Sequence, residues 1–497
     1  MRHEANRIRE QMAADPHRPL YHFLPPRYWM NDPNGCIQWR GQYHLFYQHN
    51  PAAAHWGDIH WGHAASADLV HWQDLPVALA PTPGSPDADG CWSGTACDDN
   101  GVPTLVYTAR LGQGESVCLA TSDDGLRTWR KSAQNPVISG PPPGLDPLGF
   151  RDPYVWREAG DWRMALGSGT RASGGCVLLY YSPDLRTWTY LRRLAEAGSP
   201  DPDDMWECPS FLPLGGNPRA PDALAPSGAQ GCGLKGKHVL VVSAMGQWRA
   251  IYFVGRYQEN RFIPEREGVM DWGGRYYAPQ VMADQAGRRL MFGWIREGRT
   301  LDSQIAAGWA GVQALPRVLS LAPDGALRMS PAPELEALRG ACFKAEDMAL
   351  RAGDDVLLPL EGECLEIEAE LAEVSASCSL KLRCSPREDE VTVLSYDALN
   401  QQLSVDTTRA SLATDVERGV TIAPLELAPG EQLRLHIFLD RSVLEVFAND
   451  RVCLTSRIYP SRPDSRRVQV TAAGGPARLR MLTAWRMNSI WPDQHTA

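Results

Sequence analysis

Apolar and polar residues alternate along the last third of the chain. From Leu365 to Glu370 every second residue is apolar and the residues between are glutamates, and Leu433–Asp440 alternates in the same way. A period of two is typical of β-strands that bury one face. About eight such segments up to residue 487 predict an antiparallel β-sandwich, with Glu366, Glu368 and Glu370 on a solvated strand face.

A different pattern repeats in the first part of the chain, with a spacing close to 60 residues. Ser66–Trp72, Ser122–Trp129 and Ser182–Trp188 share the order Ser-x-Asp followed by a tryptophan. Short strand pairs with Gly-containing turns precede this pattern at Cys36–Tyr47 and Tyr154–Leu166. These repeats predict propeller blades of four strands each. We expect the repeated tryptophans to serve packing rather than ligand contact: Trp72, Trp129 and Trp188.

Five blade starts can be counted from the motifs that open each repeat. They lie near Asp32, Trp92–Ser93, Asp152, Glu207 and Tyr277–Pro279. The innermost strand of each blade lines the axis of a propeller, so we expect these positions to surround one mouth of its channel. An alternative is a propeller of the WD type that serves protein interactions, in which acids at these positions only cap turns.

The tryptophans mark a boundary between two parts of the chain. Fifteen of the 17 lie between Trp29 and Trp309, and the remaining two are Trp485 and Trp491. The predicted fold class is therefore all-β, a five-bladed β-propeller followed by a C-terminal antiparallel β-sandwich. We assign residues 1–325 to the propeller, which carries catalysis, 326–345 to a linker with a short helix, and 346–497 to the sandwich. Leu214–Gly236 is rich in Gly, Ala and Pro and predicts a mobile surface insertion.

Composition narrows the classes of partner. The net charge of −10 and pI near 5.7 argue against nucleic acid and against an anionic membrane surface. No run of about 18 apolar residues is present, and the charged N-terminus lacks the apolar segment of a secretory signal. The 12 cysteines include no C-x-x-C pair, which favours reduced thiols and a cytoplasmic location. The sequence leaves the oligomeric state open.

Three acidic residues stand directly before a proline or one residue from it, each ahead of a strand-like segment. They are Asp32 in Trp29–Gly35, Asp152 in Phe150–Val155, and Glu207 in Trp206–Pro209. Because proline cannot donate to a β-ladder, each proline is expected to mark the start of a strand. Three carboxylates at equivalent places of a repeating fold can converge on one point, and convergent carboxylates are the chemistry of glycosidic bond cleavage.

The neighbours of these acids suggest different roles. The amides of Asn31 and Asn34 flank Asp32 and are expected to keep it ionised, which suits a nucleophile. Trp206 and Cys208 flank Glu207 and are expected to favour its protonated form, which suits a general acid/base. Cys208 is expected to point away from the face of Glu207 and to be merely buried. Spacing alone does not assign the three roles.

The three motifs resemble the signature motifs of glycoside hydrolase family 32, the invertases and fructanases. Supporting matches are Gln48, His55–Gly57, Trp92–Gly94, Tyr277–Gln280, Gly308–Gly311, Leu315–Arg317 and Phe438–Phe447. The resemblance implies a propeller plus sandwich that hydrolyses β-fructofuranosides with retention of configuration. It implies that Asp32 is the nucleophile, Glu207 the acid/base and Asp152 the stabiliser of the transition state. It also implies sugar contacts from Asn31, Gln48, Trp56, Trp92, Ser93, Arg151, Tyr277 and Trp294, and a site without a metal or organic cofactor.

One position departs from the family pattern. Bacterial members often have an acid where this chain has Arg275. We expect Arg275 to be an outward surface residue. The alternative is that it favours an anionic leaving group such as that of sucrose 6-phosphate.

Several other functions stay open. On the same site they are hydrolysis of sucrose 6-phosphate, hydrolysis of inulin or levan, and transfer of fructose to another sugar. An inverting arabinan- or xylan-active hydrolase also uses three acids on a five-bladed propeller, and a fructan-binding protein without catalysis belongs to another class. The histidines His49, His55, His60, His63 and His71 suggest a metal, but His60 and His63 would point to opposite faces of a strand, so we expect ordinary hydrogen bonds.

Overall fold

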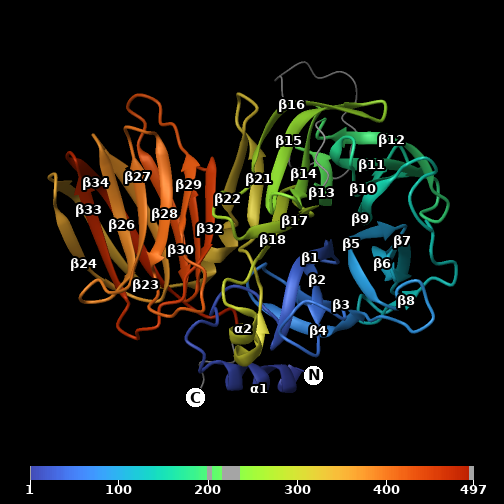
Figure 1. Cartoon of the computed structure of the whole chain (residues 1–497), viewed down its shortest axis with the longest axis horizontal. Helices are drawn as coiled ribbons and strands as arrows, with labels where there is room; N and C mark the ends of the chain where they lie inside the picture. The colour runs from blue at the N-terminus through green and yellow to red at the C-terminus, as the bar shows by residue number, and fades with distance from the viewer. Residues whose placement is uncertain (1, 199–203, 215–235, 492–497) are drawn as a thin grey trace.

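The computed structural model describes residues 2–198, 204–214 and 236–491, and nearly all of its regular structure is β-strand. Its helices are α1 (Arg2–Met12), α2 (Leu301–Ala307) and the 3-10 helix η1 (Pro333–Leu338). In Figure 1, strands β23–β34 lie on the left and β1–β18 on the right. No helix within the described ranges is long and apolar enough to span a membrane. The predicted insertion at 215–235 lies outside the described residues.

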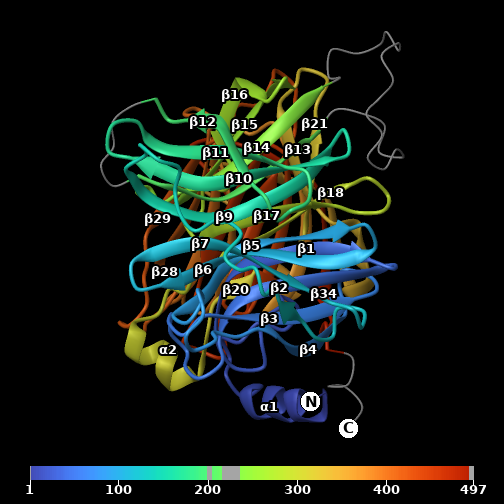
Figure 2. The same ribbon diagram turned by 90° about the vertical axis from the view of Figure 1, so that its right-hand side faces the viewer.

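Four sheets form the N-terminal part of the molecule. One has the order β19-β1-β2-β3-β4 and the next β5-β6-β7-β8. A third runs β12-β11-β10-β13-β14-β15-β16 with β9 paired to β10, and a fourth runs β17-β18-β21-β22 with β20 paired to β18. In the third sheet a single residue pair, Ser168 with Trp206, joins the strands β9–β12 to the strands β13–β16. β5 lies next to both β1 and β9 (Figure 2).

The strands of these four sheets have the following residue ranges. The first two sheets contain β1 (Tyr28–Trp39), β2 (Gln42–Asn50), β3 (His60–Ser66), β4 (Trp72–Leu79), β5 (Gly90–Asp99), β6 (Val102–Leu111), β7 (Gly114–Thr121), β8 (Arg130–Lys131) and β19 (Trp309–Ala310). The third contains β9 (Pro147–Glu158), β10 (Asp161–Thr170), β11 (Gly174–Ser182), β12 (Thr189–Glu196), β13 (Trp206–Pro213), β14 (Lys237–Ala244), β15 (Arg249–Gln258) and β16 (Arg261–Val269). The fourth contains β17 (Tyr276–Ala283), β18 (Arg289–Ile295), β20 (Val312–Gln313), β21 (Arg317–Leu321) and β22 (Leu327–Pro331). The two hairpins predicted near residues 36–47 and 154–166 are confirmed as β1–β2 and β9–β10.

The strands β1, β5, β9, β13 and β17 each contain a β-bulge. At its bulge each of these strands carries one residue more than the neighbouring strand, and the irregularities lie at Asn31–Asp32, Ser93, Asp152–Pro153, Cys208–Pro209 and Ala278–Pro279. A bulge releases an N–H from the ladder, so proline is tolerated there inside a strand. The prediction that the prolines mark strand starts is therefore wrong for β1 and β9, where several strand residues precede the acid.

The repeated Ser-x-Asp pattern forms the same turn three times. Asp68, Asp124 and Asp184 each accept hydrogen bonds from backbone N–H groups two to four residues further on. In the first two repeats the tryptophan that follows packs on aromatic rings, Trp72 on Phe23 and Phe292 and Trp129 on Phe46. The expected packing role of Trp72 is confirmed.

Two six-stranded antiparallel sheets form the C-terminal part. Their orders are β23-β34-β25-β30-β31-β32 and β24-β33-β26-β27-β28-β29. They share one hydrophobic core, to which β25 contributes Ile367 and β26 contributes Leu380. Among the described residues this part has 12 strands rather than about eight: β23 (Arg339–Leu350), β24 (Asp355–Glu361), β25 (Cys364–Ala372), β26 (Ser377–Cys384), β27 (Val391–Asp397), β28 (Gln402–Arg409), β29 (Val420–Pro424), β30 (Leu433–Asp440), β31 (Val443–Ala448), β32 (Val452–Arg457), β33 (Arg467–Ala473) and β34 (Ala477–Met487).

The acidic face predicted on β25 is only partly exposed. Glu366 is 1% exposed, and its carboxylate accepts hydrogen bonds from Arg339 and contacts His436 Nε2 at 2.7 Å. The prediction of a solvated face is wrong at this position. Strand alternation cannot reveal it, because the covering residues come from β23 and β30.

Buried charges join the two parts of the molecule. Arg317 of β21 is fully buried, and its Nη2 lies 2.9 Å from Asp271 Oδ2 and 2.6 Å from Glu445 Oε2. His22 lies between Asp440 and Glu445. Burial would lower its pKa, but the hydrogen bonds that its ring makes to these two carboxylates raise it. In the N-terminal part, α1 lies against β4 (Figures 1 and 2). Arg9 of α1 forms a hydrogen bond with Asp74 of β4 there.

Candidate active site

The three acids converge around one residue, Cys208. Its backbone N–H donates a 3.0 Å hydrogen bond to Oδ2 of Asp152. Its Sγ lies 3.4 Å from Oδ2 of Asp32 and 3.5 Å from Oδ2 of Asp152. Glu207 is the adjacent residue, so β1, β9 and β13 bring together carboxylates that are up to 175 positions apart. Asp32 and Asp152 are buried, and the Glu207 side chain is 18% exposed.

Cys208 points into this cluster, which corrects the sequence expectation. In a regular strand its side chain would lie on the face opposite Glu207. The bulge at Cys208–Pro209 and a φ of +48° at Cys208 turn the thiol towards Asp32 and Asp152 instead. Burial, followed by the charges of the neighbouring carboxylates, raises the pKa of this thiol, so Cys208 is a neutral donor here.

Hydrogen-bond donors surround Asp32. Ser93 Oγ donates to its Oδ2 at 2.6 Å and Gln48 Nε2 at 3.3 Å, while Asn31 Nδ2 donates to Oδ1 at 3.1 Å. Asn31 also donates to Gln48 Oε1 at 2.8 Å, which fixes both amides. The prediction that Asn34 donates to Asp32 is wrong. The Asn34 amide faces the Pro33 carbonyl and Ser93.

The electrostatics of Asp32 also differ from the sequence expectation. Burial, together with the negative charge of Glu207, raises the pKa of Asp32 to about 6, although Ser93, Asn31 and Cys208 oppose this shift. The donors therefore reduce the rise in the pKa of Asp32 that burial causes, but they do not reverse it. Burial likewise raises the pKa of Asp152. Arg151 opposes that shift, and the charges of Glu207 and Asp32 add to it.

Glu207 is held by two polar side chains rather than by apolar neighbours. Arg151 donates to its Oε1 from Nη2 at 2.8 Å and from Nε at 3.1 Å. The Tyr277 hydroxyl donates to its Oε2 at 2.6 Å. Tyr277 itself is 3% exposed, and burial and the nearby carboxylates raise its pKa, so it stays a donor. Trp206, the preceding residue, packs on Phe253 away from these contacts.

Sequence reasoning missed Glu115, which orients Arg151. Glu115 of β7 accepts from Arg151 Nη1 at 2.9 Å through Oε1. Its Oε2 accepts from the backbone N–H of Phe150 at 2.6 Å. The local sequence around Glu115 carries no signal for this role, because its partner lies in a different sheet. The same holds for Thr108, whose Oγ1 accepts from the backbone N–H of Asp152 at 2.8 Å.

Aromatic residues flank the carboxylates on the remaining sides. Trp29 and Trp294 meet edge to face with ring centroids 5.6 Å apart, and Trp29 Nε1 donates to Asn31 Oδ1 at 2.7 Å. Trp56 and Trp92 meet in the same way at 5.9 Å, and 53% of Trp56 is exposed. One apolar cluster links three of the tryptophans to Tyr277 and Cys208: Trp29, Trp92 and Trp294. Of the eight residues expected to contact sugar, five contact Asp32 or Glu207 directly: Asn31, Gln48, Ser93, Arg151 and Tyr277. Trp92 and Trp294 belong to the adjoining apolar cluster, and Trp56 contacts Trp92.

Arg275 is not an outward surface residue, which corrects the expectation. Its side chain is 15% exposed. Its Nη1 donates to the Glu297 carbonyl at 3.0 Å, and its Nη2 lies 2.5 Å from Oε2 of Glu417. A residue of the C-terminal part of the chain thus neutralises Arg275, a contact that the sequence around position 275 does not indicate.

The histidines singled out in the sequence do not gather around one point. His63 faces His44 at 3.0 Å, whereas His60 faces the backbone carbonyl of Asp58. Within the described ranges, Glu366, Glu368 and His436 are the one group whose ligand atoms lie close enough to share an ion. Arg339 already forms ion pairs with both of these glutamates.

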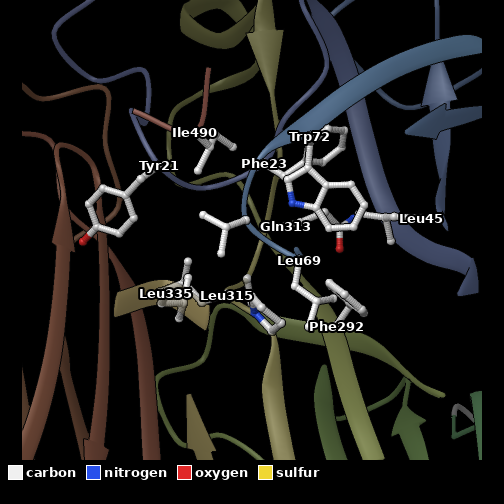
Figure 3. A pocket seen from close by; sticks show the side chains of 13 residues that line it. Tyr21, Phe23, Leu45, Leu69, Trp72, Phe292, Gln313, Leu315, Leu335 and Ile490 are labelled. Carbon is white, nitrogen blue, oxygen red and sulfur yellow. The ribbon is translucent and has the colours of Figure 1, made fainter. Parts of the chain in front are cut away.

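A buried cavity lies apart from the acids (Figure 3). Its lining is mainly apolar and includes Tyr21, Phe23, Trp72, Phe292 and Ile490. Its volume of about 20 Å³ accommodates about one water molecule and excludes a sugar. This cavity is therefore too small to be a sugar site.

Comparisons with known proteins agree with the site formed by the three acids. The family profile described as "Glycosyl hydrolases family 32 N-terminal domain" matches residues 22–331, and "Glycosyl hydrolases family 32 C terminal" matches residues 334–486. The chain is 35% identical to a sucrose-6-phosphate hydrolase of Zymomonas mobilis, covering 94% of this chain and 92% of that protein. It is 36% identical to a raffinose invertase of Escherichia coli, covering 94% and 95%. Among solved structures, fructan 1-exohydrolase IIa from Cichorium intybus has a TM-score of 0.86 and 28% identity, covering 95% of this chain and 98% of that one.

Proposed function

The chain belongs to glycosyl hydrolase family 32 and is a glycoside hydrolase, and we propose that it cleaves terminal β-D-fructofuranosyl residues from sucrose or short fructo-oligosaccharides with retention. One observation carries the proposal: three carboxylates from three inner strands meet around Cys208, each with different donors. The names of the relatives support fructosides as the substrate class.

In this mechanism Glu207 and Asp32 act in two displacements. Glu207 donates its proton to the glycosidic oxygen as the bond to the anomeric carbon breaks, and the Asp32 carboxylate attacks that carbon to form a fructosyl ester. The leaving sugar departs as an alcohol. Glu207 then takes a proton from water, which displaces Asp32 and releases fructose with its original configuration.

Arg151 and Tyr277 hold Glu207 for both steps. Two bonds from Arg151 fix one carboxyl oxygen and one bond from Tyr277 fixes the other, so the carboxyl group has a single orientation. Asp152 lies beside Asp32 and has a raised pKa. It binds sugar hydroxyls through hydrogen bonds as the oxocarbenium-like state forms. Asn31, Gln48 and Ser93 orient the nucleophile and line the fructose side, together with the tryptophan walls.

The arrangement of the sheets supports the five-bladed propeller. The strand groups β1–β4, β5–β8, β9–β12 and β13–β16, and the group of β17, β18, β20, β21 and β22, each begin with a bulged strand, and we assign one blade to each. We assign the two C-terminal sheets to a β-sandwich and keep the division of the chain near residues 326–345, where η1 lies. The described cysteines are free thiols, which fits a cytoplasmic enzyme.

Release of glucose and fructose from sucrose tests the proposal. Wild type should release both sugars in equal amounts, and Glu207→Ala should lower kcat by about 10²- to 10⁴-fold, since it removes the acid/base. Glu267→Ala is the matched control, because Glu267 is exposed on β16. Turnover that survives in Glu207→Ala, or that falls equally in Glu267→Ala, would exclude this role. Sucrose 6-phosphate, inulin and levan should be assayed beside sucrose, and transfer to a second sugar at high sucrose concentration.

A further inference from the structure

Two arginines lie next to each other at the rim of the site, and only one of them is neutralised. The backbone N–H of Arg296 donates to the carbonyl of Arg275 at 2.8 Å, so the two residues are paired neighbours. Arg275 forms an ion pair with Glu417. The guanidinium of Arg296 has no hydrogen-bond or ion-pair partner among residues 2–198, 204–214 and 236–491.

A chain of contacts connects Arg296 to the acid/base. Its Cζ lies 4.7 Å from the ring centroid of Trp248, and the Trp248 ring lies 5.1 Å from that of Tyr277. The hydroxyl of Tyr277 donates to Glu207 Oε2. Because Glu207 protonates the leaving oxygen, the leaving group must lie on its side of the site. Trp248 and Arg296 therefore stand where the leaving group is expected, opposite the Asn31, Gln48 and Ser93 contacts of Asp32.

The surroundings of Arg296 favour an anion. Trp248 is 51% exposed in the turn between β14 and β15 and offers an apolar face to a sugar ring. Arg296 is half-buried, and burial together with the charge of Arg275 lowers its pKa, although the charge of Glu417 opposes this shift. An unpaired, partly desolvated guanidinium is stabilised by an anionic ligand. Its planar fork matches the oxygens of a phosphate group and binds them through two parallel hydrogen bonds.

We propose that Arg296 binds the phosphate of a β-fructofuranoside whose leaving group is a hexose phosphate, with Trp248 packing against the hexose ring. This inference rests on the proposed function for the position of the leaving group. It assigns the selectivity for an anionic leaving group to Arg296 and not to Arg275, whose charge Glu417 already balances. A neutral leaving group would use Trp248 and leave Arg296 unpaired.

Calorimetric binding of glucose 6-phosphate and of glucose tests the site without requiring turnover. Wild type should bind glucose 6-phosphate more tightly than glucose. Arg296→Gln should weaken glucose 6-phosphate binding by about 10- to 100-fold, equivalent to about 1.4–2.8 kcal/mol. Arg249→Gln is the matched control, because Arg249 is exposed at the same turn and also stacks on a tryptophan, Trp272. It should change the affinity less than about 3-fold, as expected for a screened surface charge.

Several results would overturn the assignment. The first is that wild type binds the two sugars with equal affinity. The second is that Arg296→Gln leaves the affinity for glucose 6-phosphate unchanged. The others are that Arg249→Gln loses as much of this affinity as Arg296→Gln, or that only Arg275→Gln loses it. In turnover, Arg296→Gln should lower the ratio of kcat/KM for sucrose 6-phosphate to that for sucrose by the same factor. Binding that depends on Arg296 without fructose release from either sugar would contradict the proposed hydrolase and leave the phosphate site standing. Fructose release with binding independent of Arg296 would contradict the phosphate site alone.

Discussion

The backbone N–H of Cys208 donates a 3.0 Å hydrogen bond to Oδ2 of Asp152, and this bond joins β13 to β9 where both strands bulge. Asp152 has a φ of +65° and Cys208 a φ of +48°, conformations that cost non-glycine residues free energy. The contacts between neighbouring strands hold these conformations in place. The geometry of the acids thus depends on pairs of strands and not on any single strand.

Thr108→Val should disturb Asp152 without touching a carboxylate. Thr108 is fully buried, and its hydroxyl accepts the N–H of Asp152. Its loss leaves that N–H unsatisfied, which should lower stability by about 1–3 kcal/mol and lower kcat because Asp152 shifts. Thermal unfolding and sucrose turnover measure the two effects. Thr108→Ser restores the acceptor and should recover both, and a variant Thr108→Val that matches wild type in kcat would exclude the role.

Ser93→Ala should move the acidic limb of the pH–rate profile to higher pH. As the proposed nucleophile, Asp32 must be ionised to attack, and its pKa of about 6 predicts that kcat/KM falls as the pH drops below about 6. The Ser93 bond lowers that pKa, so removing it should raise the limb by about one pH unit. Profiles of kcat/KM against pH for both proteins provide the measurement. A limb that stays in place, or moves to lower pH, would contradict the assignment of Asp32.

Glu115→Gln should leave the carboxyl group of Glu207, the proposed acid/base, less firmly oriented. It keeps the size of the side chain but removes the charge that faces Arg151 Nη1. Because Arg151 then orients Glu207 less firmly, kcat should fall by about tenfold while KM changes less. Arg157→Gln, which removes an ion pair at a distance from the acids, controls for lost surface charge. Equal effects in the two variants would show that Glu115 has no specific role.

Arg317→Met should separate the stability of the junction from catalysis. The substitution removes the arginine from between two buried carboxylates, Asp271 and Glu445, and breaking a buried ion pair costs about 3–5 kcal/mol. The midpoint of thermal unfolding should fall clearly. Arg478→Met removes an exposed pair with Asp347 and should leave the midpoint near that of wild type. Similar midpoints for the two variants would contradict a structural role for the buried pair.

The sequence predicted the acids and the presence of strands better than it predicted the surroundings of the acids. Motifs with spaced acids locate Asp32, Asp152 and Glu207, and alternation locates β25 and β30, because both signals lie within one segment of chain. Bulges arise from the register between two strands, so the position of the prolines and the orientation of Cys208 were missed.

Contacts that cross between sheets were missed for the same reason. Glu115 and Thr108 reach Arg151 and Asp152 from β7 and β6. Glu417 reaches Arg275 from the C-terminal part. The pKa of Asp32 also could not be judged from its sequence neighbours, because burial and the charge of Glu207 outweigh the local donors.

The covalent intermediate provides the most direct test of the central claim, that Asp32 and Glu207 cleave β-fructofuranosides by double displacement. Glu207→Ala should be mixed with β-D-fructofuranosyl fluoride, whose leaving group needs no protonation, and analysed by mass spectrometry. Without its general base the enzyme should accumulate one fructosyl residue per chain, attached to the peptide that contains Asp32. Turnover without an adduct, or an adduct on another residue, would contradict the mechanism.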